Sequence, residues 1–127
     1  MLIGAHARAA YGIPRATGDM DVWVRATPEN AMRVWKALAE YGAPLHDMTV
    51  DDFSRPEVVF QIGLPPYRID ILTKISGLSF EEAWPNRIYA DFGGATYAVI
   101  SRDDFIRNKR AAGRPKDLAD VADVENQ

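Results

Sequence analysis

Glycine and proline divide this chain into short segments, and this punctuation limits the length of every helix and strand that it can form. Segments that alternate polar and apolar residues, or form short apolar runs, are expected to be strands. These are residues 2–4, 19–25, 57–62, 67–73, 87–92 and 96–100. Helices are expected over residues 5–11, 27–41, 79–84, 101–112 and from 115 onward. We therefore predict a single α/β (α+β) domain, 1–127, with a mixed sheet flanked by helices.

Several helix ends carry local signals. Thr27 stands before Pro28, which places a capping hydroxyl and a proline at the start of a helix that Gly42 ends. Ser79 is followed three residues later by Glu82, the pattern of a capping box. The helix over 27–41 is expected to have an apolar face that contains Met32, Trp35 and Leu38 or Ala39. The helix from 115 is expected to have one that contains Leu118, Val121 and Ala122 or Val124. The segments 57–62 and 67–73, and likewise 87–92 and 96–100, are expected to form hairpins.

The composition excludes several kinds of site. The chain has no cysteine, which excludes disulfides, thiolate zinc sites and cysteine nucleophiles. His6 and His46 are its only histidines, so any metal would be held by oxygen. The formal net charge of −3 argues against a chain-wide basic surface for nucleic acid. No apolar run approaches the roughly 18 residues of a membrane-spanning helix, and no signal-peptide pattern is evident. We expect a cytoplasmic protein that does not contact membranes.

Two aspartates lie two positions apart on the strand expected over 19–25. Alternate residues of a strand face the same side, so Asp19 and Asp21 point one way while Met20 points toward a core. Asp70 has the same position relative to the strand over 67–73, where Arg68 shares its face. If the two strands are neighbours, three carboxylates converge on one patch.

Three converging carboxylates repel one another unless a cation neutralises them. Mg²⁺ is the natural partner, because it takes oxygen ligands and leaves positions for water and substrate phosphates. Two such ions would stabilise the attacking and leaving oxygens of a phosphoryl transfer, and one carboxylate can accept the proton of the attacking hydroxyl. The alternative for the Asp-x-Asp pair is that both are exposed charges on a strand edge.

A small-residue junction precedes these carboxylates. Gly4 and Ala5 lie where a strand is expected to pass into a helix, so a phosphate can approach the backbone amides at a helix N-terminus. Thirteen residues separate this pair from Asp19. Arg15 and Thr17 stand on the loop between them. Arg15 is a candidate phosphate contact, and Thr17 either contacts phosphate or shapes the turn.

This order of motifs resembles the nucleotidyltransferase fold of the polymerase β superfamily. Members of that superfamily carry a Gly-Gly or Gly-Ser pair, a gap of this size, Asp-x-Asp or Asp-x-Glu, and a third acidic residue downstream. The chain is more closely similar to bacterial abortive-infection toxin nucleotidyltransferases. The residues that carry this similarity are 3–7, 11–12, 14–17, 19–21, 105–109 and 113–118.

The resemblance implies Mg²⁺-dependent transfer of a nucleoside monophosphate from a nucleoside triphosphate to an acceptor hydroxyl, with pyrophosphate released. The acceptor would be RNA, a protein or a small molecule, and the protein would belong to a toxin–antitoxin or phage-defence system. Asp19 and Asp21 would be metal ligands, and Asp70 a metal ligand or the general base. Gly4 and Ala5 would cradle the triphosphate, although Ala5 stands where the superfamily more usually has glycine or serine.

A basic segment follows the last expected strand. Residues 102–117 include six basic and three acidic residues. Lys109 lies four residues after Phe105 and three after Ile106, so it flanks the apolar stripe of the helix over 101–112 and can reach a β- or γ-phosphate. The alternative is a solvated helix face with ion pairs. Arg114 and Lys116 flank a turn and are weaker candidates for contacting phosphate or acceptor.

Two other functions stay open at this point. A catalytically degenerate nucleotidyltransferase-fold module would bind nucleotide or a partner protein without catalysis, and Ala5 and the small size of the chain motivate this reading. A small phosphatase or nuclease would use the same carboxylates for hydrolysis. A chain of 127 residues has little room for an acceptor-binding domain, so we expect a homodimer or an antitoxin-like partner to complete the acceptor site.

Overall fold

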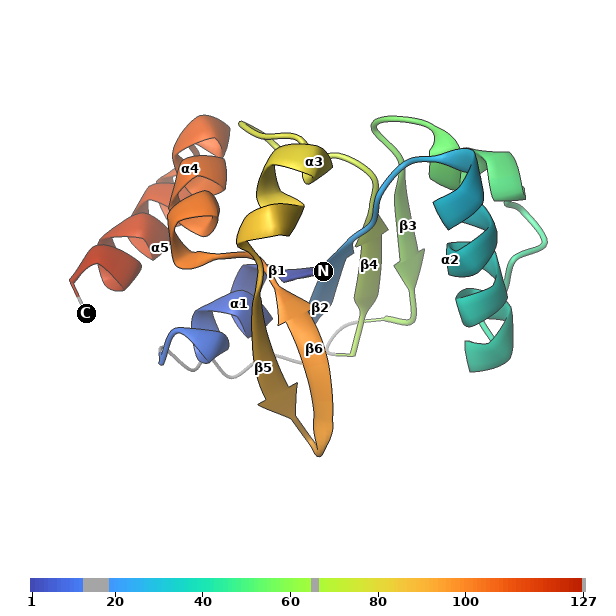
Figure 1. Cartoon of the computed structure of the whole chain (residues 1–127), viewed down its shortest axis with the longest axis horizontal. Helices are drawn as coiled ribbons and strands as arrows, with labels where there is room; N and C mark the ends of the chain where they lie inside the picture. The colour runs from blue at the N-terminus through green and yellow to red at the C-terminus, as the bar shows by residue number, and fades with distance from the viewer. Residues whose placement is uncertain (13–18, 65–66, 127) are drawn as a thin grey trace.

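The computed structural model describes residues 1–12, 19–64 and 67–126. This part of the chain is a mixed α/β structure built on a six-stranded sheet in the order β3-β4-β2-β1-β6-β5 (Figure 1). The strands are β1 (Leu2–Ile3), β2 (Met20–Trp23), β3 (Val59–Ile62), β4 (Ile69–Leu72), β5 (Ile88–Phe92) and β6 (Ala95–Val99). The helices are α1 (Gly4–Ala10), α2 (Pro28–Tyr41), α3 (Phe80–Ala83), α4 (Arg102–Ala112) and α5 (Pro115–Glu125), with 3₁₀ turns η1 (Val50–Ser54) and η2 (Trp84–Asn86). The predicted mixed sheet flanked by helices is confirmed.

The centre of the sheet joins strands that are distant in the sequence. β2 pairs with β4 in parallel and with β1 in antiparallel orientation, and β1 pairs in parallel with β6. The parallel pairing of β2 with β4 needs a crossover connection, which contains α2. β3 with β4, and β5 with β6, form antiparallel hairpins, as their sequences predict. The two strands expected to carry carboxylates are therefore direct neighbours.

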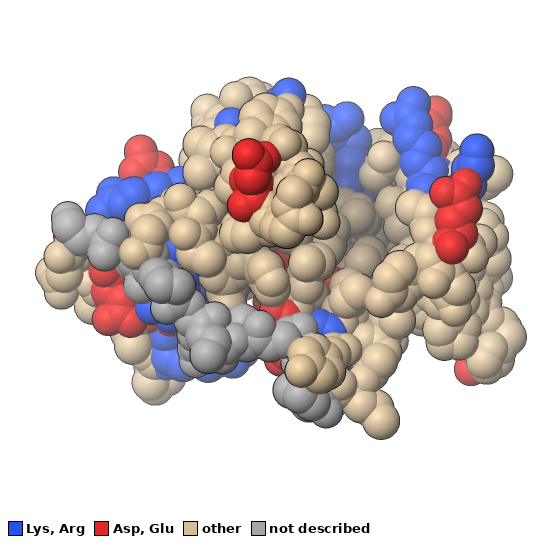
Figure 2. Space-filling view, turned by 90° about the horizontal axis from the view of Figure 1, so that it is seen from below, with Lys and Arg blue, Asp and Glu red and all other residues tan. Residues whose placement is uncertain are grey.

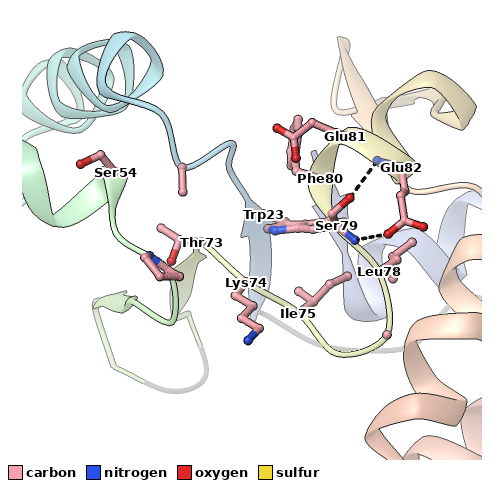
Figure 3. Close-up of a pocket in the computed structure, with 13 residues that line it drawn as sticks. Trp23, Ser54, Thr73, Lys74, Ile75, Leu78, Ser79, Phe80, Glu81 and Glu82 are labelled. Atoms are coloured by element: carbon pink, nitrogen blue, oxygen red, sulfur yellow. Dashed lines mark hydrogen bonds between the residues drawn. The ribbon is translucent and has the colours of Figure 1, made fainter.

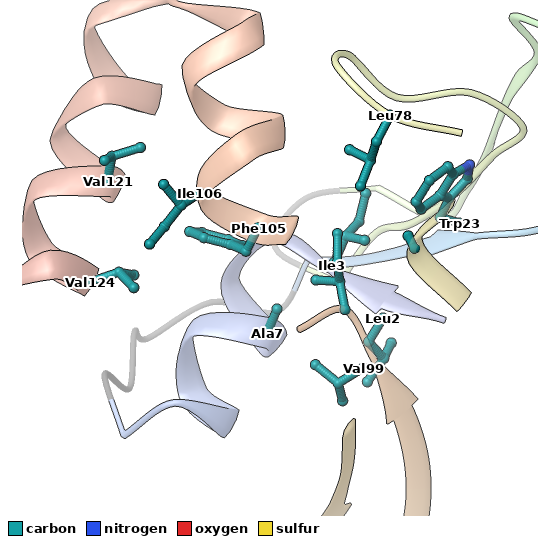
Figure 4. Close-up of a cluster of buried hydrophobic side chains, with 12 residues drawn as sticks. Leu2, Ile3, Ala7, Trp23, Leu78, Val99, Phe105, Ile106, Val121 and Val124 are labelled. Atoms are coloured by element: carbon teal, nitrogen blue, oxygen red, sulfur yellow. The ribbon is translucent and has the colours of Figure 1, made fainter. Parts of the chain in front are cut away.

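Helices cover both faces of the sheet. Neighbouring residues of β4 therefore pack into different apolar clusters. Ile71 belongs to a cluster with α2 and η1, whereas Leu72 packs against a larger cluster that includes α1, α4 and α5. Figure 1 shows α2 on one side of the strands and α4 and α5 on the other. Figure 4 shows the larger cluster, in which residues of the described strands and helices meet: Leu2, Ile3, Ala7, Trp23, Leu78, Val99, Phe105, Ile106, Val121 and Val124.

The local helix signals hold in the folded chain. Pro28 is the first residue of α2, and the Thr27 hydroxyl accepts a hydrogen bond from the Asn30 amide at 3.3 Å. Ser79 and Glu82 form the expected capping box at α3. These ends depend on contacts within a few residues, so the sequence alone predicts them.

Two expected apolar faces are each wrong at one residue, while Leu38 of α2 is buried as expected. Met32 is 59% exposed, and Ala31 is the residue of that turn that packs into the core. Leu118 is 50% exposed, whereas Val121 and Val124 are buried as expected. A helix of this length can turn by one residue and still present an apolar stripe, so the docking partner decides which face is covered.

The ends of the first elements also differ from the prediction. The strand expected over 2–4 stops at Ile3, and Gly4 is already the first residue of α1. The backbone of Gly4 has φ +68, which lies outside the extended region. The segment between α2 and β3, for which the sequence predicts no helix or strand, contains the 3₁₀ turn η1, which buries Phe53. In the described part of the chain, no helix is both long and apolar enough to cross a membrane.

Candidate active site

Asp21 and Asp70 lie side by side on two neighbouring strands of the sheet. They are register partners in the parallel pairing of β2 with β4. Strand partners in register point to the same face, so the two carboxylates lie side by side. Asp19 immediately precedes β2 and lies on the same cavity. The expected convergence of the three carboxylates on one patch is confirmed.

A cavity of about 540 Å³ lies where β2 and β4 begin. Its lining comes from several separate parts of the chain: Gly4, Ala5, Asp19, Asp21, Arg68, Asp70, Leu72, Lys109, Arg114, Lys116 and Asp120. Six of the eight expected site residues are in this lining, whereas Arg15 and Thr17 lie outside the described residues. Figure 2 looks at this end of the sheet and shows acidic and basic atoms side by side in the central hollow.

Gly4 lies against the Asp21 carboxylate. A Cβ atom at Gly4 would lie 2.6 Å from Asp21 Oδ2, closer than side chains normally approach. Together with its φ of +68, this contact leaves glycine as the residue that fits the position. The sequence suggested that a small residue here admits a phosphate, and the structure adds that it also admits a carboxylate.

Arg68 pairs with Asp70 inside the cavity. Arg68 Nε lies 3.0 Å from Asp70 Oδ1, and the Asp70 side chain is 13% exposed. The two atoms form an ion pair but do not meet hydrogen-bond geometry, and both are buried without a hydrogen-bond partner among the described residues. Asp70 Oδ1 is therefore a buried acceptor with an unused hydrogen-bonding direction.

Lys109 is held beside the carboxylates by acids on α5. Its side chain is 17% exposed, and Nζ lies 3.5 Å from Asp117 Oδ1 and 3.9 Å from Asp120 Oδ2. Asp117 is fully buried and also accepts a hydrogen bond at 2.6 Å from Nε of Arg114. Arg8 of α1 donates to Asp120 Oδ1 at 2.8 Å. This network connects α1, α4 and α5 around one wall of the cavity.

The sequence prediction missed the two acids that hold Lys109. Asp117 and Asp120 lie three residues apart on α5, so they share one helix face. Aspartates at that spacing beside apolar Val121 are a detectable signal, but they are also typical of a solvated helix. Only the packing of α5 against α4 shows that the face is turned toward Lys109.

The local environment disfavours negative charge on Asp21. Burial raises the pKa of the Asp21 carboxyl, and the neighbouring charge on Asp70 raises it further. The Lys109 ammonium acts in the opposite direction on this pKa. The cavity lining holds four aspartates and four basic residues, so its formal charges balance, and burial is the main reason that the pKa of Asp21 is raised.

The donor chemistry of the site suits a hard cation. No group of three or more His, Asp or Glu side chains within residues 1–12, 19–64 and 67–126 is arranged to hold a metal ion in the present conformation. Asp19, Asp21 and Asp70 nevertheless offer only oxygen atoms, which Mg²⁺ prefers. Asp70 Oδ1 is buried without a hydrogen-bond partner among the described residues, but Arg68 Nε lies 3.0 Å from it, so a cation between the strands would share Asp70 with Arg68.

Comparisons with protein-family models and with curated proteins identify no relative for this chain.

Proposed function

We propose that this protein is a nucleotidyltransferase that moves a nucleoside monophosphate from a nucleoside triphosphate to an acceptor hydroxyl. The observation that supports this most directly is the joint lining of one cavity by Gly4, Ala5, Asp21, Asp70 and Lys109. These residues combine backbone amides at a helix start, paired carboxylates and a lysine. Each of these groups has a distinct task in transferring a nucleotide.

Phosphate binding is assigned to two parts of the cavity wall. Gly4 and Ala5 begin α1, so their backbone amides are among those without a partner inside the helix. These amides would donate to the non-bridging oxygens of the triphosphate. The Lys109 ammonium, held by Asp117 and Asp120, would neutralise charge on the β- and γ-phosphates.

In the proposed reaction the acceptor oxygen attacks the α-phosphorus and forms a new P–O bond. The bond between the α-phosphorus and the bridging oxygen breaks, and pyrophosphate leaves with that electron pair. The proton of the acceptor hydroxyl passes to the Asp70 carboxylate. Bound Mg²⁺, held by Asp19 and Asp21 and also by Asp70 where that residue serves as a ligand, would supply charge stabilisation for the phosphates.

Labelled nucleotides test this function directly. The purified protein is incubated with Mg²⁺ and each of the four α-³²P nucleoside triphosphates, and tRNA, total protein and an aminoglycoside are offered as acceptors. We expect label on one acceptor class, lost in Asp21→Asn and retained in Asp47→Asn. Asp47 is the matched control because its side chain is 91% exposed. Absence of both transfer and nucleotide binding would contradict the proposal.

A second candidate function is nucleotide or partner binding without catalysis. It is favoured by the ion pair between Arg68 and Asp70, because the carboxylate assigned as base is already opposite a cation of the same chain. Ala5 also lacks the hydroxyl that a serine would offer. Calorimetry separates the two functions. A binding module takes up nucleotide equally well without Mg²⁺ and after Asp21→Asn, whereas a transferase loses affinity in both cases.

A further inference from the structure

A second cavity of about 560 Å³ lies at the other end of β2 and β4 (Figure 3). It lies between the segment that follows β4, the start of α3 and η1, and its lining includes Trp23, Ser54, Thr73, Ile75 and Phe80. Its volume is in the range of roughly 300–1,000 Å³ that is usual for small-molecule sites. Among the described residues, it shares no lining residue with the cavity of the carboxylates.

Trp23 contributes an unused hydrogen-bond donor to this cavity. Its side chain is 1% exposed, and its indole Nε1 is buried without a hydrogen-bond partner among the described residues. In Figure 3 the nitrogen lies on the edge of the ring turned toward Thr73, while the rest of the ring extends toward Ser79. A buried donor left without an acceptor is costly, so a ligand that accepts this hydrogen bond gains affinity.

The hydroxyl groups of the lining make hydrogen bonds elsewhere, and none of the described residues accepts from the Trp23 indole. The Thr73 hydroxyl accepts from the Val58 amide at 2.9 Å. The Ser79 hydroxyl caps α3 by accepting from the Glu82 amide at 3.1 Å. Trp23 itself is fixed by an edge-on contact with Phe80 at 5.2 Å between ring centroids. The indole ring is thus held in place in the cavity wall, with its N–H on the edge nearer Thr73.

The charged residues of the lining are paired with residues outside it. Lys74 Nζ lies 3.0 Å from Glu57 Oε1. Glu82 Oε2 lies 3.2 Å from Nη2 of Arg107. A ligand therefore meets no unpaired charge on these residues, and a charged ligand would have to compete with existing ion pairs.

The rest of the lining includes apolar groups. Ile75, Leu78 and Phe80 line it from the segment after β4 and from α3, and Ala26 and Pro56 line it from two other segments. Burial of an apolar molecule against these side chains is favourable, because it removes apolar surface from water. The surroundings thus combine an apolar wall with one directional donor.

We propose that this cavity binds an uncharged small molecule with an apolar body and a carbonyl-type acceptor, which takes the hydrogen bond of the Trp23 indole. This site is separate from the nucleotidyl-transfer proposal and does not depend on it. Trp23 lies two residues, about 7 Å, along β2 from Asp21. A ligand bound to Trp23 would therefore contact the strand that carries Asp21.

Nuclear magnetic resonance of the ¹⁵N-labelled protein tests the site. The probe is acetanilide, which has an aromatic ring and a neutral carbonyl, and it is titrated to millimolar concentration. We expect the indole N–H signal of Trp23 to shift downfield and saturate, while the signals of Trp35 and Trp84, outside this lining, stay in place. Benzoate, which carries a charged acceptor on the same ring, should bind at least about tenfold more weakly.

Two variants keep the test decisive. Trp23→Phe retains an aromatic ring and removes the donor, and it should weaken acetanilide binding about tenfold. Because Trp23 is a core residue, Ala26→Leu is the second variant, which fills part of the cavity and leaves the indole intact. Trp84→Phe is the matched control and should bind acetanilide as the unmodified protein does.

Three results would overturn the proposal. The first is a Trp23 signal that does not respond to acetanilide, which would mean that a trapped water satisfies the indole. The second is unchanged affinity in both Trp23→Phe and Ala26→Leu. The third is tighter binding of benzoate than of acetanilide, which would show that the site selects an anion.

Discussion

Asp21 on β2 and Asp70 on β4 are direct partners in the parallel register of the two central strands. This pairing places two carboxylates side by side, with Gly4 packed against Asp21 and Arg68 paired with Asp70. Like charges at this spacing are costly in a folded protein unless something neutralises them. Arg68 offsets part of this cost at Asp70, whereas Asp21 forms no ion pair with a described residue and keeps a raised pKa.

Replacing Asp21 with asparagine should stabilise the protein at neutral pH. The folded-state pKa of Asp21 is raised, so the stability linked to its protonated form is present at low pH and lost as the pH rises through that pKa. We expect the melting temperature of Asp21→Asn to exceed that of the unmodified protein by roughly 3 °C at pH 7. The difference should shrink toward pH 4.

Asp47→Asn is the control for this experiment, because Asp47 is highly exposed and should not change the melting temperature. Millimolar Mg²⁺ should stabilise the unmodified protein more than Asp21→Asn. A lower melting temperature for Asp21→Asn across the whole pH range would contradict the interpretation of Asp21 as an electrostatic liability.

Replacing Gly4 with alanine should displace the Asp21 carboxylate. The added Cβ would lie 2.6 Å from Asp21 Oδ2 and would impose a positive φ on a non-glycine residue. Gly93→Ala is the matched control, because φ is +60 there and no atom lies within 4 Å of the added Cβ. Thermal unfolding should show a loss at least about 1 kcal/mol larger for Gly4→Ala, and equal losses would exclude the clash.

Lys109→Met should weaken the binding of nucleoside triphosphate about tenfold or more. The variant keeps an apolar stem of similar length and removes the charge assigned to the β- and γ-phosphates. Isothermal titration calorimetry with ATP and with AMP measures the effect, and the loss should be larger for ATP. Lys36→Met, on the exposed side of α2, should bind both as the unmodified protein does. Equal losses for ATP and AMP would assign Lys109 a structural role alone.

Asp117→Asn should destabilise the fold by about 3 kcal/mol, because it leaves the cations Arg114 and Lys109 facing a buried neutral group. The hydrogen bond from Arg114 holds the pKa of Asp117 below its usual value. Its stabilising contribution should therefore be present above about pH 4 and lost as the pH falls further.

Urea unfolding of the unmodified protein and Asp117→Asn at pH 7 and pH 3 measures this difference. Asp103→Asn serves as the control, because the Asp103 side chain is 95% exposed and should cost little at either pH. The two proteins are compared by the difference between their free energies of unfolding. If that difference is the same at pH 7 and at pH 3, the stabilisation by Asp117 is not electrostatic.

Much of the secondary structure was predictable because its signals are local. Thr27 and Pro28 set the start of α2, and Ser79 with Glu82 set the start of α3, through contacts that span three or four residues. The same reasoning was wrong at Met32 and at Leu118, since the face that a helix buries depends on its docking partner.

The candidate site was predictable only in part. Asp19, Asp21 and Gly4 are close in the sequence, so strand periodicity and a junction of small residues point to them. Asp117 and Asp120 were missed because a pair of acids on a terminal helix is indistinguishable from a solvated surface until α5 is packed on α4. The orphaned indole of Trp23 carries no sequence signal at all.

By itself, the sequence determined the alternation of short strands and helices and the residue types available for chemistry. It also predicted, from the two-residue period of a strand, that Asp19 and Asp21 share a face. Both line one cavity, although Asp19 lies just before β2 rather than within it. Tertiary structure alone decided that β4 lies next to β2 in parallel, with Asp70 opposite Asp21. Pairing between strands separated by a whole helix depends on the packing of both faces of the sheet, which no local pattern encodes.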